Sequence, residues 1–207
     1  MDRTTGPREL HVTFAPEGPE GELKALAARH GAKLTAIELS SGLWRTQHML
    51  TLETEETVEA AVRRAEALGR ELAAAGFPVL RTKVESSPFD QENPRTPEAA
   101  RAADRAGRYH EWHVKVRTSA GQDEAALRAV VRRHGAKFSA NARKSAADGT
   151  VERFVTGRAF GAVQDQADQA CAGLVRDLGA VCAVAEVDRE FVVHDSCMAL
   201  DQGWEAP

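Results

Sequence analysis

Residues 8–14, Arg-Glu-Leu-His-Val-Thr-Phe, return in altered form as residues 110–116, His-Glu-Trp-His-Val-Lys-Val. Each copy is followed by nearly the same second segment, Ala-Arg-His-Gly-Ala-Lys at 28–33 and Arg-Arg-His-Gly-Ala-Lys at 132–137. His11 therefore corresponds to His113, and His30 to His134. A repeat of roughly one hundred residues has the size of a whole small domain rather than of a solenoid unit. We expect the chain to contain one domain twice.

The composition restricts the classes of partner. The 207 residues carry a formal net charge of −4, which offers no electrostatic attraction to nucleic acid or to an anionic membrane. No apolar run approaches the roughly 18 residues of a membrane span. The three cysteines, Cys171, Cys182 and Cys197, fit no Cys-x-x-Cys spacing and indicate reduced thiols in a cytoplasmic protein. Neither nucleic acid nor a membrane is expected as a partner, and homo-oligomerisation is left open.

Hydrophobic periodicity divides each repeat into strand, helix, strand, strand, helix and strand. This βαββαβ order predicts an α+β, ferredoxin-like unit, in which a four-stranded antiparallel sheet carries both helices on one face. We expect a first ferredoxin-like repeat at 8–86, a linker with a short helix at 87–108, a second repeat at 109–195 and a C-terminal tail at 196–207. The two repeats could pair about a pseudo-twofold axis, with their sheets facing each other, like a homodimer joined by a linker.

The sheet face opposite the helices is where a site can form. Strand 110–116 alternates between apolar and polar residues, which places Glu111, His113 and Lys115 together on the polar face. The last strand, 183–194, is expected to lie beside it with its own acidic row, which contains Glu186, Asp188 and Glu190. Carboxylates with a histidine can hold a divalent cation or exchange protons, while arginine and lysine bind phosphate or carboxylate oxygens.

We predict that these polar faces line a cavity that binds or processes a small, anionic metabolite, with a divalent cation as a candidate cofactor. The residues proposed for acid–base catalysis are Glu111, His113, Glu186 and Asp188. The proposed metal ligands are Glu111, His113 and Glu186. The proposed ligand-binding residues are Lys115, Arg143, Arg81, Lys83, Arg158 and His11.

Alternative interpretations stay open. The polar faces could be solvated, as open faces of antiparallel sheets often are. The repeats could instead form a non-catalytic ligand-binding or regulatory module with a site at their interface. RNA binding on the sheet is disfavoured, because that mode needs aromatic residues on the sheet face and a basic surface, and aromatic residues make up only 5% of this acidic chain. His30 and His134 are interpreted as helix ends, where a cationic ring meets the negative end of the helix dipole.

The doubled unit resembles fused versions of the dimeric α+β barrel proteins, and also tandem small-molecule-binding regulatory domains of the amino-acid-sensing kind. Separately, Glu111-Trp-His-Val-Lys115 resembles the Glu-x-Glu-x-Lys strand of triphosphate tunnel enzymes. In those enzymes the acidic residues bind divalent metal and the basic residues bind the phosphate chain. Here His113 stands in the place of the second glutamate. Resemblances of fold or of a short pattern do not establish a function.

The two polar faces differ in their side chains. When the repeats are aligned by sequence, Thr13 corresponds to Lys115 and Lys83 corresponds to Glu186. The second repeat therefore has the more polar face, and we expect it to contribute most of the site.

Overall fold

The computed structural model describes residues 7–15, 20–39, 44, 46–90, 93–118, 123–145 and 150–201. The first repeat contains β1 (Arg8–Phe14), α1 (Glu20–His30), β2 (Lys33–Leu39), β3 (Thr46–Thr54), α2 (Val58–Ala74) and β4 (Val79–Ser86). A connecting helix, α3 (Pro97–Arg105), follows. The second repeat contains β5 (Tyr109–Thr118), α4 (Glu124–Arg133), β6 (Lys137–Ser145), β7 (Val151–Ala159), α5 (Gln164–Gly179) and β8 (Ala183–Asp195), after which comes the short 3-10 helix η1 (Met198–Asp201).

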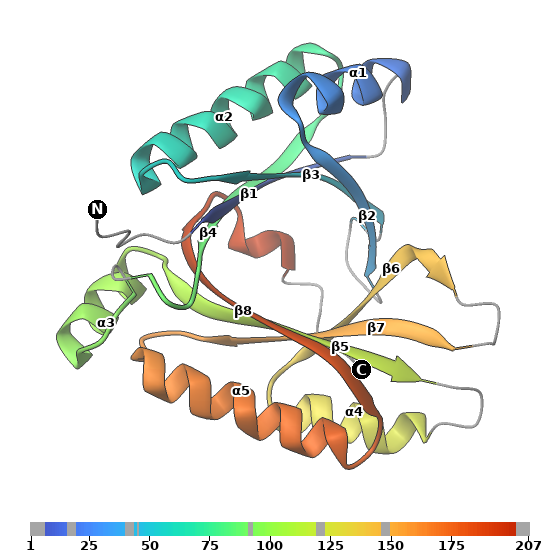
Figure 1. Cartoon of the computed structure of the whole chain (residues 1–207), viewed down its shortest axis with the longest axis vertical. Helices are drawn as coiled ribbons and strands as arrows, with labels where there is room; N and C mark the ends of the chain where they lie inside the picture. The colour runs from blue at the N-terminus through green and yellow to red at the C-terminus, as the bar shows by residue number, and fades with distance from the viewer. Residues whose placement is uncertain are drawn as a thin grey trace.

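The eight strands form one closed antiparallel barrel (Figure 1) with the order β1-β3-β2-β6-β7-β5-β8-β4. Each repeat supplies four neighbouring strands in the ferredoxin-like order, β4-β1-β3-β2 and β8-β5-β7-β6. The barrel is closed where β2 pairs with β6 and where β4 pairs with β8. The predicted fold class, two ferredoxin-like units whose sheets face each other, is confirmed.

Two strand pairings locate the pseudo-twofold axis. Ile37 on β2 pairs with Asn141 on β6, and both follow the shared Gly-Ala-Lys segment at the same distance. Ser86 on β4 pairs with Phe191 on β8, and both are partners of equivalent residues on the central strands β1 and β5. In a twofold assembly a residue on the axis meets its own counterpart. The chain is therefore built like a symmetric dimer whose two subunits have been joined.

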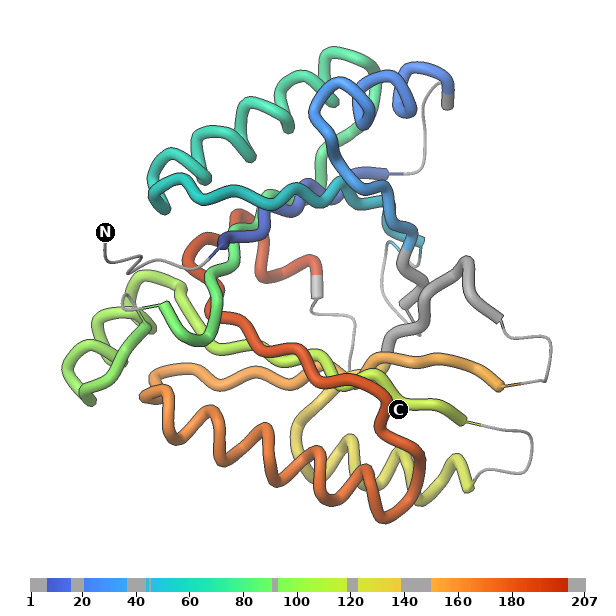
Figure 2. Tube along the Cα trace, in the orientation of Figure 1, coloured from blue at the N-terminus to red at the C-terminus, as the bar shows by residue number. Residues whose placement is uncertain are grey.

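The helices cover the outside of the barrel, and the polar strand faces line its inside. Figure 2 shows the two halves on opposite sides of the molecule, with the long helices outermost. On β1, Val12 and Phe14 belong to the hydrophobic core beneath α1 and α2. On β5, Val114 and Val116 belong to the equivalent core beneath α4 and α5. Because side chains alternate along a strand, the residues between them point into the barrel.

One glycine follows the first helix of each repeat. Gly31 and Gly135 have φ angles of 63° and 59°, in the left-handed region that glycine adopts without steric cost. The backbone can then turn sharply from helix into β2 or β6. None of the helices in the described part of the chain combines the length and the apolar character needed to cross a membrane.

The connection between the repeats is anchored to both of them. Arg8 at the start of β1 donates to Asp90 Oδ2 over 3.2 Å, and both side chains are buried. Asn93 donates through Nδ2 to Gln164 Oε1 on α5 over 3.3 Å. Polar contacts of the linker therefore hold the two halves together in addition to the two strand pairings.

We expect Gly157→Ala to destabilise the protein. Gly157 on β7 lies against the Trp112 indole, and an added Cβ would lie 2.2 Å from Trp112 Nε1. Overpacking of this kind costs about 1–3 kcal/mol of unfolding free energy, measurable by denaturant titration. The control is Gly173→Ala in the middle of α5, where the nearest atom to an added Cβ is 3.6 Å away. The control is expected to gain up to about 1 kcal/mol from better helix propensity, and equal losses in both variants would contradict the packing argument.

Candidate functional site

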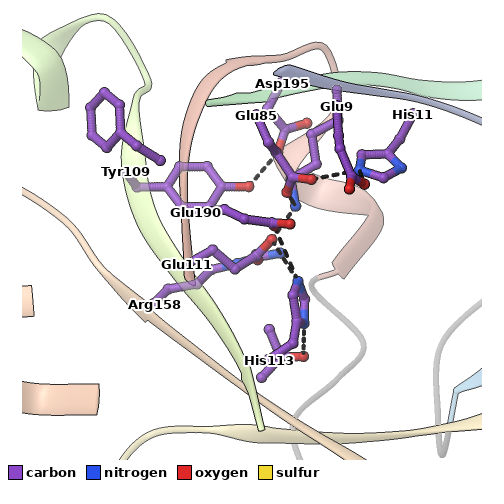
Figure 3. A network of polar contacts seen from close by, with 12 residues as sticks. Glu9, His11, Glu85, Tyr109, Glu111, His113, Arg158, Glu190 and Asp195 are labelled. Atoms are coloured by element: carbon purple, nitrogen blue, oxygen red, sulfur yellow. Dashed lines mark hydrogen bonds and ion pairs between the residues drawn. The ribbon is translucent and has the colours of Figure 1, made fainter. Parts of the chain in front are cut away.

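A network of charged side chains fills the barrel interior between the central strands of the two halves (Figure 3). The strands β1, β4, β5, β7 and β8 supply these side chains, because the alternate residues on their other face pack beneath the helices. The residues labelled in the close-up view are Glu9, His11, Glu85, Tyr109, Glu111, His113, Arg158, Glu190 and Asp195.

In the second repeat the network centres on Glu111, whose side chain is 1% exposed. Its Oε1 accepts a hydrogen bond of 2.5 Å from Arg158 Nε, and its Oε2 contacts the Lys83 ammonium. His113 Nε2 lies 3.5 Å from Glu111 Oε2 and 3.7 Å from Glu190 Oε2. The other ring nitrogen of His113, Nδ1, is 2.9 Å from the Thr156 hydroxyl. Thr156 therefore orients the imidazole so that Nε2 faces the two carboxyl groups.

The first repeat builds an equivalent group around His11. Its Nδ1 lies 2.9 Å from the Thr51 hydroxyl, as His113 Nδ1 does from Thr156. Its Nε2 lies 2.5 Å from Glu85 Oε2 and 3.5 Å from Glu9 Oε2. Each half of the barrel thus contributes a histidine held by a threonine and turned toward two glutamates.

Lys83 connects the two groups. Its ammonium contacts Glu85 on its own strand and Glu111 on β5, and the Lys83 side chain is 9% exposed. Burial raises the pKa of both glutamates, but their charged partners together outweigh burial and lower it. These partners are Lys83 and His11 for Glu85, and Lys83, Arg158 and His113 for Glu111. Both carboxylates therefore stay ionised inside the barrel.

The other two glutamates behave in the opposite way. Burial raises the pKa of Glu190 well above its ordinary value, and the neighbouring Glu85 carboxylate raises it further. Burial also raises the pKa of Glu9. Each histidine therefore faces one carboxyl group that stays ionised and one that keeps its proton to higher pH.

The spacing of these groups matches that of metal ligands. Ligand atoms of Glu85, Glu111, His113 and Glu190 all lie within 4.8 Å of one another, and so do those of Glu9, His11 and Glu85. Glu85 belongs to both groups. A carboxylate and imidazole donor set suits first-row divalent ions such as Mn²⁺, Fe²⁺ and Zn²⁺.

A recess of about 230 Å³ leads to these groups and is strongly acidic. Its charged lining includes Glu9, Glu53, Glu85, Asp188 and Glu190. The one basic residue in this lining, Arg189, donates to Asp168 Oδ1 on α5 over 2.8 Å. The recess therefore attracts cations more readily than anions.

The structure brings together five of the residues predicted from the sequence. Glu111 and His113 lie in the second group, and His11 lies in the first. Lys83 and Arg158 contact Glu111. The two basic residues thus act as partners of buried carboxylates.

The remaining predicted residues lie elsewhere. Arg81 pairs with Asp195 beside the network, and Asp188 is exposed at the recess. Glu186, 61% exposed, pairs with Lys115 and belongs to neither metal-ligand group among the described residues. The side chain of Arg143 falls outside the part of the structure that is described.

The strand register corrects the alignment of the repeats. His11 lies opposite Lys83, and His113 lies opposite Asp188, so Lys83 corresponds to Asp188. Thr13 lies opposite Arg81, and Lys115 lies opposite Glu186, so Arg81 corresponds to Glu186. The expectation that Lys83 becomes Glu186 was wrong by two residues, because sequence alone does not show where the longer β8 meets β5.

Three further glutamates, Glu9, Glu85 and Glu190, lie in the two groups but are not among the site residues predicted from the sequence, although strand alternation places all three on the polar faces. The signal was present, because Glu9 and Glu111 precede the two matching histidines by two residues. Glu85 and Glu190 are the cross-strand partners of Glu9 and Glu111, and a correct register would have found them. The threonines that hold the histidines come from β3 and β7 and follow from the same register.

No protein-family model matches the chain, and no curated protein matches it significantly. Among solved structures, the small subunit of acetolactate synthase from Thermotoga maritima is 14% identical, with a TM-score of 0.30 over 92% of this chain and 96% of that chain. The regulatory subunit of aspartate kinase from Thermus thermophilus is 14% identical, with a TM-score of 0.33 over 83% and 91%. Chlorite dismutase from Candidatus Nitrospira defluvii is 13% identical, with a TM-score of 0.31 over 91% of both chains. Because these TM-scores are low, the fold is assigned from the strand order and register, and the function from the side chains.

Asp195 gives the protein a pH-dependent contribution to stability. Burial opposes its ionisation, but hydrogen bonds from Arg81, from the Tyr109 hydroxyl over 2.7 Å and from the backbone amide of Cys197 outweigh burial and lower its pKa. A carboxyl group with a lowered pKa stabilises the fold above its ordinary pKa of 3.8, and the contribution is lost as the pH falls below that value.

We therefore expect Asp195→Asn to lower the unfolding free energy by about 2 kcal/mol near neutral pH, measured by denaturant titration. The difference between wild type and variant should shrink below about pH 4, because the wild-type carboxyl group then takes up a proton. Asp188→Asn, the same change at an exposed position of β8, is the control and should stay within about 0.5 kcal/mol of wild type. A difference that remains constant down to about pH 3 would show that the charge of Asp195 is not the cause.

Proposed function

We propose that the barrel interior binds a divalent cation at Glu85, Glu111, His113 and Glu190 and, next to it, a small anionic metabolite. The observation that supports this most strongly is the presence of four ligand atoms, from three strands of both repeats, within 4.8 Å of one another. One of them is a histidine nitrogen whose ring is oriented through its other nitrogen, as in known metal centres.

The proposed anionic ligand depends on the cation. The interior basic residues Arg81, Lys83 and Arg158 each pair with a buried carboxylate, and the recess is acidic. An anion would therefore meet net negative charge on its way in unless a metal ion compensates for it. A bound divalent cation would supply that attraction and would act as a Lewis acid toward an oxygen of the ligand.

The residues of the chain have distinct roles in this proposal. Glu111 and His113 would hold the cation, with Arg158 and Thr156 fixing their orientation. Glu85 and Glu190 would complete the ligand set around the cation. In this proposal Glu190 takes the place of Glu186 in the ligand set, because Glu186 is exposed and pairs with Lys115.

A non-catalytic binding module is the second candidate. The observation that favours it is the position of the cysteines, the strongest nucleophiles of the chain. Cys171 is buried in the core beneath α5, where burial raises its pKa to about 11, and Cys182 contacts the Leu178 carbonyl oxygen. A ligand recovered unchanged after incubation with the metal-loaded protein would favour this second candidate.

The primary test measures the affinity of the full chain for Mn²⁺ by titration calorimetry. We expect His113→Ala to weaken Mn²⁺ binding by about 100-fold or more, because it removes the nitrogen ligand. The control is His134→Ala, since His134 pairs with Asp177 at a helix end far from the barrel interior in the fold. Equal affinity of wild type and His113→Ala would contradict the proposed site.

A second test removes only the hydroxyl group that orients the ring. We expect Thr156→Val to weaken Mn²⁺ binding by about 10-fold, because outer-shell partners typically contribute 10–100-fold to metal affinity. Thr118→Val is the matched control, since Thr118 donates only to the Val151 carbonyl oxygen at the far end of β5 among the contacts described. If both variants bind Mn²⁺ like wild type, the threonine has no role in positioning His113.

A further inference from the structure

We infer that the first repeat holds a second divalent cation, at Glu9, His11 and Glu85, so that the barrel contains a two-metal site bridged by Glu85. This inference rests on the proposed function, because it adds a second ion next to the one proposed at Glu85, Glu111, His113 and Glu190. It assigns the pair of ions to the interface of the repeats.

The geometry of Glu85 supports a bridging role. Its side chain is 3% exposed, and it is the one residue shared by the two metal-ligand groups of the described chain. Its Oε2 lies 2.5 Å from His11 Nε2, in the first group. Its Oε1 is buried and forms an ion pair with the Lys83 ammonium, which also contacts Glu111 of the second group. Each oxygen of this carboxylate is therefore directed to a different group.

Glu190 provides a buried carboxyl oxygen without a hydrogen-bond partner. Its Oε2 receives no hydrogen bond and lies 3.7 Å from His113 Nε2. Buried carboxylate oxygens normally accept at least one hydrogen bond or coordinate a metal. Such an oxygen in a set of ligand atoms within 4.8 Å of one another points to a cation in this cluster.

Comparison of the two repeats identifies the same set of ligands twice. Nine residues of each repeat form the inner grid of three strands, and the register matches them one to one. Four matched positions have the same residue type in both repeats. They are the glutamate of the central strand, the histidine, the threonine that holds the histidine, and the glutamate of the last strand. The matched pairs are Glu9 with Glu111, His11 with His113, Thr51 with Thr156, and Glu85 with Glu190.

The other matched positions differ in charge or size. They are Thr13 with Lys115, Lys83 with Asp188, Arg81 with Glu186, Glu53 with Arg158, and Met49 with Phe154. The two faces have therefore diverged everywhere except at the groups that could bind metal. A merely structural ion-pair network would not require both histidines to keep the same threonine partner at the same 2.9 Å.

The charges in and around the site also favour cations. Six acidic groups, Glu9, Glu53, Glu85, Glu111, Asp188 and Glu190, belong to the two groups or to the recess that leads to them. Lys83 and Arg158 contact these ligands, and Arg189 lines the recess. Acidic side chains therefore outnumber basic ones, which favours the binding of cations.

The test is electron paramagnetic resonance of the full chain titrated with Mn²⁺, together with equilibrium dialysis to count bound ions. An isolated Mn²⁺ ion gives a six-line spectrum, whereas two ions bridged by a carboxylate are magnetically coupled and give a broadened spectrum with many more lines. We expect wild type to bind two Mn²⁺ ions and to show the coupled spectrum at saturation. Glu9→Gln and His11→Ala should bind one ion and return the six-line spectrum.

Controls separate this inference from the proposed function. His30→Ala, at a surface ion pair with Glu71, should keep both ions. Glu9→Gln serves if His11→Ala fails to fold, since the Glu9 side chain is 40% exposed. One bound ion that is lost in His113→Ala and unaffected by Glu9→Gln would overturn the two-metal site and leave the proposed function intact. No bound Mn²⁺ in wild type would overturn both.

Discussion

The ammonium group of Lys83 lies between two buried carboxylates that come from different halves of the chain, Glu85 on β4 and Glu111 on β5. Removing charges from water costs several kcal/mol for each ion, and only close partners offset this cost. Arg158 and His11 satisfy the outer sides of the same carboxylates. Loss of one partner from such a network typically costs about 3–5 kcal/mol, so the closed barrel depends on its internal charge balance.

An apolar barrel interior would have been easier to stabilise. Replacing a buried ion pair by well-packed apolar residues is often neutral or favourable for stability, so stability alone does not account for four buried or half-buried glutamates around two histidines. The hydrophobic cores of this protein lie beneath the helices, outside the barrel. Apolar residues pack the sheets onto the helices, and polar residues predominate on the enclosed faces, where Met49 and Phe154 are exceptions. Such a division fits a binding site better than a scaffold.

The fold was predictable because its signals are local and occur twice. The strand alternation around His11 and His113 and the His-Gly-Ala-Lys segments define the strand and helix order of each repeat, and the closed barrel follows when two such sheets face each other. The site was only half predictable. Alternation along β8 shows that Glu186, Asp188 and Glu190 share a face, but their depth depends on the pairing of β8 with both β5 and β4, which includes register shifts in both ladders. Only Glu190 lies deep in the barrel, whereas Glu186 reaches the surface.

The two repeats share the residues that could bind metal but differ in the charged residues beside them. Where the first repeat has Lys83, the second has Asp188, and where the first has Glu53, the second has Arg158. Each substitution reverses a charge, and these two reversals run in opposite directions. Arg81 with Glu186 is a third reversal and Thr13 with Lys115 adds a positive charge, so the distribution of charge differs between the two inner faces. Lys83 and Arg158 both contact Glu111, so the two basic side chains converge on one carboxylate of the second repeat. The same duplication that makes the fold symmetric therefore leaves the two histidine groups electrostatically different, with the first group facing the acidic recess and the second compensated by lysine and arginine.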